Sequence, residues 1–207
     1  PGTEEFVITL CTMNFMAEGI NDFMLGQLEG QMFEFKGTVE GDFNLRTLPT
    51  SYILQLKVGA QVVFIKNHLG GKYVNGTIAK VESLSPDKIE VLLEDGETIE
   101  LVQEEWENKR YRFDNTNRRI NSEVIGRFKQ FPIKLAWAVT IHKSQGLTFE
   151  KAVVDMGRGA FAHGQLYVAL SRCRTLAGLY LRQEVKPKDI IVDERVVEFS
   201  KRQVLNH

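Results

Sequence analysis

The chain changes pattern twice, and these changes limit the folds that it can adopt. An apolar run over residues 6–12 predicts a buried parallel strand, and from Asn14 to Gly30 apolar residues recur at helical spacing. From Leu56 to about Pro132, short strands alternate with regularly placed turn residues. Strand-and-helix patterning then resumes. The sequence therefore predicts an α/β domain that is interrupted by a small inserted β-barrel.

We expect the α/β domain to comprise residues 1–55 and 133–207, and the barrel to comprise residues 56–132. The β-like pieces between 31 and 55 are interpreted as a connection that leads out of the first domain. The chain opens with Pro1 instead of Met, which indicates a fragment of something longer.

Composition limits the function and the location that we expect for the chain. The net charge of −1 gives no global signature of nucleic-acid binding, so such binding must depend on local patches. Two cysteines far apart in sequence, Cys11 and Cys173, have apolar neighbours and predict reduced, buried thiols. No signal peptide or membrane-spanning run is recognisable. We therefore expect an intracellular protein, in the bacterial cytoplasm or nucleoid.

Residues 135–149 end an apolar run with a compact group of polar residues. Hydroxyls, an ammonium, an amide and a glycine are groups that hold phosphate oxygens. They are supplied by Thr140, His142, Lys143, Ser144, Gln145 and Gly146. The alternative is an ordinary buried element whose polar end reaches solvent. The sequence leaves open whether this stretch is a helix throughout or a strand followed by a turn.

Two further segments carry candidate site residues. Thr12 and Asn14 lie at the predicted strand-to-helix turn, where they are placed to meet an anion or simply to cap the helix. A helix is predicted over residues 160–174, on which Gln165 and Arg172 are seven residues apart and share one face. The alternative for Arg172 is a C-terminal charge that complements the helix dipole.

Charge is unevenly distributed inside the predicted barrel. Residues 87–107 are strongly acidic, whereas residues 109–134 are mainly basic, include Arg118 and Arg119, and are interleaved with aromatic residues. Such a mixture suits single-stranded nucleic acid, because cations pair with phosphates and rings stack on bases. The alternative is a solvated hairpin whose aromatic residues face the barrel core.

Two motifs together resemble a known family. Residues 140–146 (TIHKSQG) followed by residues 164–172 (GQLYVALSR) are similar to the fifth and sixth motifs of superfamily-one DNA helicases. The resemblance is strongest to the branch that contains RecD and the petite-integration-frequency (PIF) helicases. Residues 12–14 resemble the motif that opens the second RecA-like domain, and residues 74–77 are typical of its inserted SH3-like barrel.

The resemblance implies a RecA-like (P-loop NTPase type) parallel-sheet domain with an SH3-like insertion. It also implies that single-stranded DNA is gripped by Thr12, Asn14, Thr140, His142, Lys143 and Ser144. The basic segment adds Arg118 and Arg119 as candidate nucleic-acid-binding residues. Gln145, Gly146 and Gln165 are expected near ATP, with Gln165 ordering Arg172. Arg172 matches the arginine finger, whose planar, permanently charged fork stabilises the transferred phosphoryl group.

One element of an ATP motor is not recognisable. The only Gly-Lys pair, Gly71-Lys72, is followed by Tyr73 and reads as a turn instead of a phosphate-binding loop. We therefore expect ATP and Mg²⁺ to be used only by the full-length protein, together with an N-terminal RecA-like domain of the same polypeptide. The resemblance implies an ATP-dependent DNA helicase that moves five-prime to three-prime. Two alternatives are a non-catalytic module that binds single-stranded nucleic acid and a degenerate interaction domain.

Overall fold

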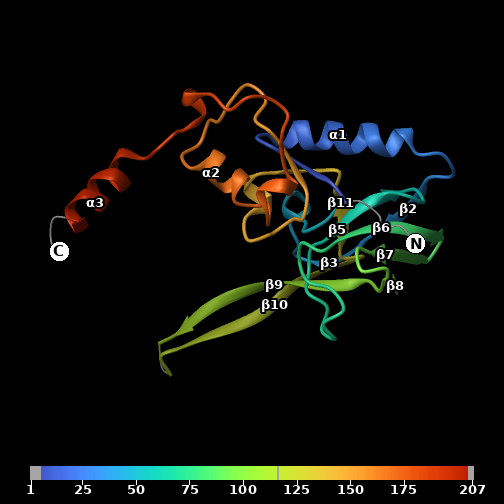
Figure 1. Cartoon of the computed structure of the whole chain (residues 1–207). Helices are drawn as coiled ribbons and strands as arrows, with labels where there is room; N and C mark the ends of the chain where they lie inside the picture. Colours follow the sequence, from blue (N-terminus) through green and yellow to red (C-terminus); the bar gives the residue numbers. More distant parts are fainter. Residues whose placement is uncertain (1–5, 116, 205–207) are drawn as a thin grey trace. The chain divides into compact units, whose positions relative to one another are not determined.

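A computed structural model describes residues 6–115 and 117–204 (Figure 1). The described chain divides into two compact units, which are considered separately below. The parallel-sheet unit contains residues 6–26 and 136–204, and the antiparallel unit contains residues 27–135. The expected boundaries at residues 55 and 132 therefore shift to residues 26 and 135. No helix in the described part is long and apolar enough to cross a membrane.

The parallel-sheet unit has the α/β pattern that the sequence predicts. Its four strands are all parallel and lie in the order β12, β1, β13, β14. Their bounds are β12 Ala138–Thr140, β1 Ile8–Cys11, β13 Ala152–Asp155 and β14 Leu179–Leu181. The helices are α1 Asn14–Gln27, α2 Gln165–Leu170 and α3 Glu194–Val204. Short 3-10 turns are η2 His142–Ser144, η3 Leu176–Gly178 and η4 Pro187–Asp189.

Helix α1 fixes the outermost strand of this sheet. Its buried Ala17 packs against Cys11 and Ala138, with Met16 and Ile20 beside them. The Asn21 amide donates to the carbonyl of Ala138 and accepts from its N–H, each at 2.9 Å. The side chain thus makes the pair of bonds that a neighbouring strand would make. Because Thr140 is the last residue of β12, these two hydrogen bonds help to position the first residue of the polar motif.

Burial raises the pKa of the Cys11 thiol from 9.0 to about 11, and Asp155 adds to the rise. Since the pKa is higher in the folded state, the unfolded chain loses this proton first, and stability falls between pH 9 and 11. We expect the free energy of unfolding to drop by about 2 kcal/mol over this window. Urea denaturation at pH 8.5 and 11 checks the drop, and Cys11→Ala should reduce it; an equal drop in the variant would contradict the assignment.

Cys173 differs from the expectation. It is half-buried, not buried, while Cys11 is fully buried, and both thiols are free. The reason is that Cys173 lies beyond the end of α2, in a segment that pairs with Phe149 through an isolated parallel bridge.

The antiparallel unit contains three sheets. The largest has the order β11-β5-β6-β7-β8, with only antiparallel pairs. Its strands are β5 Gln61–Phe64, β6 Ile78–Ser85, β7 Lys88–Leu93, β8 Thr98–Glu100 and β11 Ile133–Leu135. The others are β3-β10-β9 and β2-β4, made by β2 Phe33–Lys36, β3 Thr38–Gly41, β4 Ile53–Leu56, β9 Glu104–Asp114 and β10 Arg119–Gln130. The short 3-10 turn η1 spans Leu45–Thr47.

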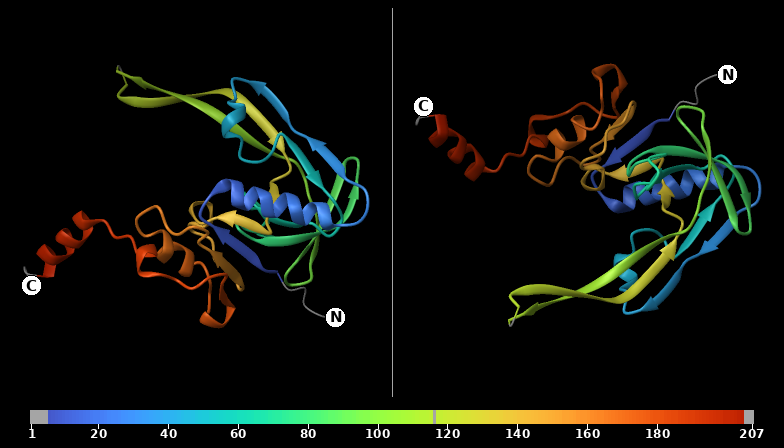
Figure 2. Two further views of the ribbon diagram at one scale, coloured as in Figure 1. Left: turned by 90° about the horizontal axis from the view of Figure 1, so that it is seen from above. Right: turned by 90° about the horizontal axis from the view of Figure 1, so that it is seen from below.

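Strands β9 and β10 form a long two-stranded hairpin (Figure 2). At its base, Phe128 is fully buried and stacks on Trp106, with ring centroids 5.8 Å apart. Near its tip, Tyr111 and Phe113 are 67% and 61% exposed. Some aromatic residues of the basic segment therefore face the core and others face solvent, and its single-strand binding stays a prediction.

Candidate functional site

The candidate site lies at the carboxyl edge of the parallel sheet. Because the strands are parallel, the segments that follow β1, β12 and β13 all start at this edge. Ligands of open α/β sheets bind at that edge, where the connecting loops meet. The end of β12 is tied to the end of β1 by a 2.9 Å hydrogen bond from the Ile141 N–H to the Cys11 carbonyl. This bond brings the segment of Thr12 and Asn14 next to the polar motif of residues 140–146.

The segment after β1 supplies Thr12 and Asn14. Thr12 is buried, and its hydroxyl lies 3.6 Å from the Met16 sulfur, one turn further along the chain. Asn14 is exposed at the first residue of α1. Asn14 also lines a pocket, which is described below, and its two expected roles stay predictions.

The polar motif starts in a strand, β12, and continues in a turn, η2. The stretch is therefore not a helix throughout, which was the alternative that the sequence left open. Thr140 ends β12, and the 3-10 turn η2 follows directly. Within this turn His142 and Lys143 are exposed. Ser144 is fully buried, and its hydroxyl donates to the Ile141 carbonyl at 2.7 Å. Its side chain therefore braces the turn that presents its two neighbours.

Gly146 closes this turn with a φ of +80°. This left-handed conformation favours glycine, and a Cβ there would meet no atom within 4 Å. The backbone conformation of the turn thus explains why glycine stands at position 146. Its expected proximity to ATP stays a separate prediction.

Helix α2 is shorter than predicted. It spans six residues and ends at Leu170, so Arg172 lies beyond it. The expectation that Gln165 and Arg172 share one helical face is therefore wrong. The physical reason is a tertiary pairing: the Phe149 N–H donates to the Arg172 carbonyl at 2.8 Å, and the Arg174 N–H donates to the Phe149 carbonyl at 2.9 Å. This bridge draws residues 172–174 out of the helix.

The Arg172 guanidinium binds its own unit in this structure. Nε donates to the Val168 carbonyl at 3.0 Å, Nη1 to the Leu147 carbonyl at 3.1 Å and Nη2 to the Ser171 hydroxyl at 2.9 Å. The first of these contacts is the C-terminal capping role that the sequence analysis kept as the alternative. The second joins α2 to the loop after η2, so Arg172 physically links the two motifs.

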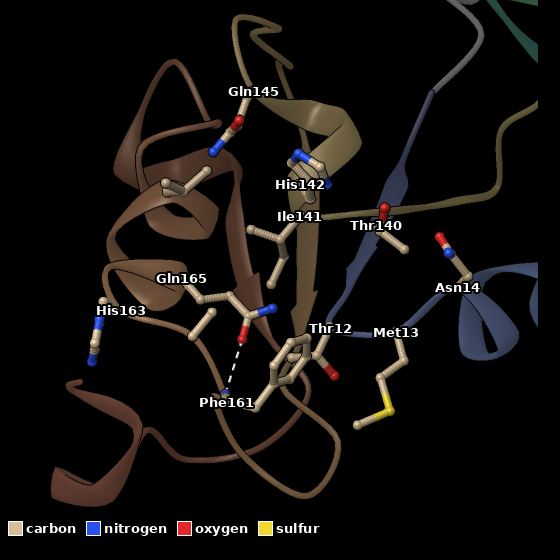
Figure 3. Close-up of a pocket in the computed structure, with 12 residues that line it drawn as sticks. Thr12, Met13, Asn14, Thr140, Ile141, His142, Gln145, Phe161, His163 and Gln165 are labelled. Carbon is tan, nitrogen blue, oxygen red and sulfur yellow. Dashed lines mark hydrogen bonds between the residues drawn. The ribbon is translucent and has the colours of Figure 1, made fainter. Parts of the chain in front are cut away.

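Half of the predicted site residues line one pocket of about 470 Å³ (Figure 3). They are Thr12, Asn14, Thr140, His142, Gln145 and Gln165. This volume is in the range of small-molecule sites. Lys143, Ser144, Gly146 and Arg172 lie outside the pocket lining, in the same unit.

Sequence reasoning missed the loop that forms another part of the pocket. Phe161, Ala162 and His163 precede α2 and line the pocket, whereas the prediction placed them inside a helix. Gly157, Gly159 and Gly164 all have positive φ, and this run of glycines is the signal that could have predicted a loop.

Arg118 and Arg119 lie in the other unit, at the tip of the β9–β10 hairpin. Both are exposed, and Arg118 is the one non-glycine residue with positive φ (50°) in the described part of the chain. The β-ladder pairs Arg119 with Asp114 and Ile120 with Phe113. Because paired residues share a face, the hairpin presents a mainly apolar side and a side of mixed charge, where Arg110, Arg112 and Arg119 lie with Asp114 and Glu123.

The pocket does not fit a complete magnesium–nucleotide site. Its lining contains two histidines but neither a lysine, an arginine nor a carboxylate. In the part of the chain that the structure describes, no group of three or more histidine, cysteine or acidic residues could hold a metal ion.

Comparisons with known proteins give the family of the chain. Residues 135–180 match the UvrD-like helicase C-terminal domain. The chain is 30% identical to the ATP-dependent DNA helicase Pif1 of Campylobacter jejuni over 223 residues, which covers 96% of this chain and 48% of that protein. Unliganded Pif1 from Bacteroides is 36% identical with a TM-score of 0.86, covering 97% and 46% of the two chains. Bacteroides Pif1 in complex with ADP-AlF3 and single-stranded DNA is 35% identical with a TM-score of 0.75, and the match covers 98% of this chain and 46% of that chain.

The fold and the motifs thus define a DNA helicase domain of superfamily one. Within this class the chain belongs to the Pif1 helicase family. It spans about half the length, or less, of the curated relatives that it matches.

Proposed function

We propose that this chain is one motor half of an ATP-dependent DNA helicase. The parallel-sheet unit would bind single-stranded DNA and supply Arg172 for ATP hydrolysis at the interface with an N-terminal RecA-like domain. The observation that carries the proposal is the pocket at the carboxyl edge, where three separate segments bring the predicted DNA-binding and nucleotide-binding residues together. A relative of the same family has been crystallised with ADP-AlF3 and single-stranded DNA, which supports both ligands.

In this proposal the strand lies along the segments that follow β1 and β12. Thr12, Asn14, Thr140 and His142 offer hydroxyl, amide and imidazole groups toward the pocket, and Lys143 offers a cation beside it. These groups bind phosphate and sugar oxygens without reading sequence. Ser144 would act indirectly, by bracing η2 through its bond to Ile141.

Gln145, Gly146 and Gln165 would lie on the nucleotide side of the same site, next to Arg172. For Arg172 to reach a γ-phosphate, its guanidinium must leave the Leu147 and Val168 carbonyls. Each such hydrogen bond has a net value of about 1 kcal/mol, which a doubly charged phosphate can easily replace. Because these bonds join α2 to the loop after η2, their exchange would couple the nucleotide to the DNA grip.

The antiparallel unit would be the SH3-like insertion that guides DNA. Its five-stranded sheet of short antiparallel strands and the turn at Val74–Thr77 favour that assignment. The exposed Tyr111 and Phe113, which share a face of the β9–β10 hairpin with Lys109, support a second candidate function, a single-strand-binding module centred on this hairpin.

The proposal predicts two properties of the isolated 207-residue chain. It should show no magnesium-dependent ATP hydrolysis, because no carboxylate cluster for the metal is present in the described residues. It should bind single-stranded DNA with an affinity that falls as salt rises. Fluorescence anisotropy and a phosphate-release assay check both. ATP hydrolysis that Arg172→Ala abolishes would contradict the motor-half proposal, and binding that is absent at all salt concentrations would favour an interaction domain.

A further inference from the structure

The loop between β13 and α2 is held in place by four hydrogen bonds to backbone N–H groups. Asp155 accepts from Gly157 at 2.9 Å, Asp189 accepts from Ala160 at 3.2 Å, Gln165 accepts from Phe161 at 3.1 Å, and the Ile191 carbonyl accepts from Gly164 at 2.9 Å. Asp189 is itself buried and caps η4. These anchors fix the loop backbone, so its side chains are presented in a set geometry.

Phe161 stands out in this fixed loop, because its side chain is 60% exposed while its backbone is anchored. Its ring lines the pocket together with Thr12 and Gln165, and Figure 3 shows the bond that ties its N–H to the Gln165 side chain. An exposed ring that is not needed for the core, but is held rigidly, is a ready surface for stacking.

The chemistry of the pocket fits a neutral, flat and polar-edged ligand. Its side chains other than the two histidines are apolar or neutral polar, with hydroxyls from Thr12 and Thr140 and amides from Asn14, Gln145 and Gln165. Lys143, which offers a cation to a phosphate, lies outside the lining. A nucleobase has a π-face for the ring and donors and acceptors on its edge for the amides.

We propose that this pocket takes one unstacked base of the single strand, with Phe161 as its stacking partner and Gln165 as the residue that positions Phe161. This inference rests on the proposed function in placing a single strand at the carboxyl edge. It adds a base contact to a site whose other expected contacts are to the backbone. Because every base has a π-face, the contact tolerates any sequence.

The test measures the affinity of the 207-residue chain for single-stranded oligonucleotides at low salt. One oligonucleotide is intact, and the others carry a single abasic site at each position in turn. We expect Phe161→Ala to weaken binding of the intact strand about tenfold, while Phe161→Trp retains it. An abasic site at one position should weaken binding by the unmodified chain by the same factor. With that oligonucleotide, Phe161→Ala should cause no further loss of affinity. Tyr167→Ala, which removes a 76% exposed ring outside the pocket, is the matched control.

Gln165 is tested by the change in environment of a base that is labelled with 2-aminopurine at that position. Gln165→Leu removes the acceptor for the Phe161 N–H and should reduce the fluorescence change, whereas Gln165→Glu keeps an acceptor and should retain it. Equal losses at every abasic position, or additive losses with Phe161→Ala, would overturn the base pocket. If His142→Ala and Lys143→Ala still abolish binding in that case, the motor-half proposal stands without it.

Discussion

Replacing Arg172 by alanine in a helicase that joins this chain to the proposed N-terminal RecA-like domain is expected to lower DNA-stimulated ATP hydrolysis about a thousandfold. Removing an arginine finger deletes the planar cation that stabilises charge on the transferred phosphoryl oxygens. Arg172→Lys should be almost as severe, because a point charge cannot reproduce the guanidinium fork. Steady-state phosphate release at saturating ATP measures the loss.

Arg174→Ala is the matched control for this prediction. Arg174 is exposed, lies two residues further along the chain and pairs with Glu150, so its loss removes the same charge from the same segment. We expect its hydrolysis rate to stay within about threefold of the unmodified enzyme. Similar rates for Arg172→Ala and the unmodified enzyme, or equal losses in both variants, would contradict the assignment of Arg172 as the finger.

The structural role of Arg172 must be separated from its proposed catalytic role. Its guanidinium contacts Leu147, Val168 and Ser171, so Arg172→Ala should also lower the free energy of unfolding by about 1–2 kcal/mol. Urea denaturation of the isolated chain measures this cost. A loss of that size leaves the fold intact and cannot account for a thousandfold change in rate.

The elements of the parallel sheet could be predicted from sequence because each has a strong local signal. The apolar run that contains β1 and the helical spacing that follows it match the observed strand and α1 closely. The end of α2 could not be predicted in the same way. Local spacing favours a helix through Arg172, but the bridge between Phe149 and Cys173 competes for the same backbone groups and prevails.

The domain boundary could not be predicted from local patterns either, because it depends on pairing between strands that are far apart in the sequence. Residues 27–55 carry weak β-patterns that read as a connection. In the structure β2 pairs with β4, and β3 pairs with β10, whose residues lie more than eighty positions further along the chain. Pairings of this kind depend on which edge strands meet in space, and no local pattern encodes them. The segment therefore joins the antiparallel unit.

The candidate site was predictable where residue type and strand ends coincide. Thr12, Thr140 and His142 follow strands of one parallel sheet, so a common edge follows from topology alone. The position of Phe161 was not predictable, because its loop is held partly by distant residues, through the hydrogen bonds to Asp189 and to the Ile191 carbonyl. The sequence thus identified the polar half of the pocket and missed the aromatic half.

Replacing His142 and Lys143 together by alanine is expected to weaken binding of single-stranded DNA to this chain about thirtyfold at low salt. Both side chains are exposed on η2, which the buried Ser144 holds rigid, so they can meet the strand without reorganisation. Loss of one lysine–phosphate contact should also reduce the slope of log affinity against log salt by about 1. Anisotropy titrations at several salt concentrations measure both quantities.

Arg118 and Arg119 provide the comparison that decides between the two binding functions. They lie at the tip of the β9–β10 hairpin in the antiparallel unit, and their replacement by alanine should weaken binding less than the loss of His142 and Lys143. Lys201→Ala, which removes an exposed cation from α3, controls for net charge and should leave affinity unchanged. If only the Arg118 and Arg119 variant loses binding, the strand is held by the hairpin, and the chain acts as a binding module instead of the DNA-gripping half of a motor.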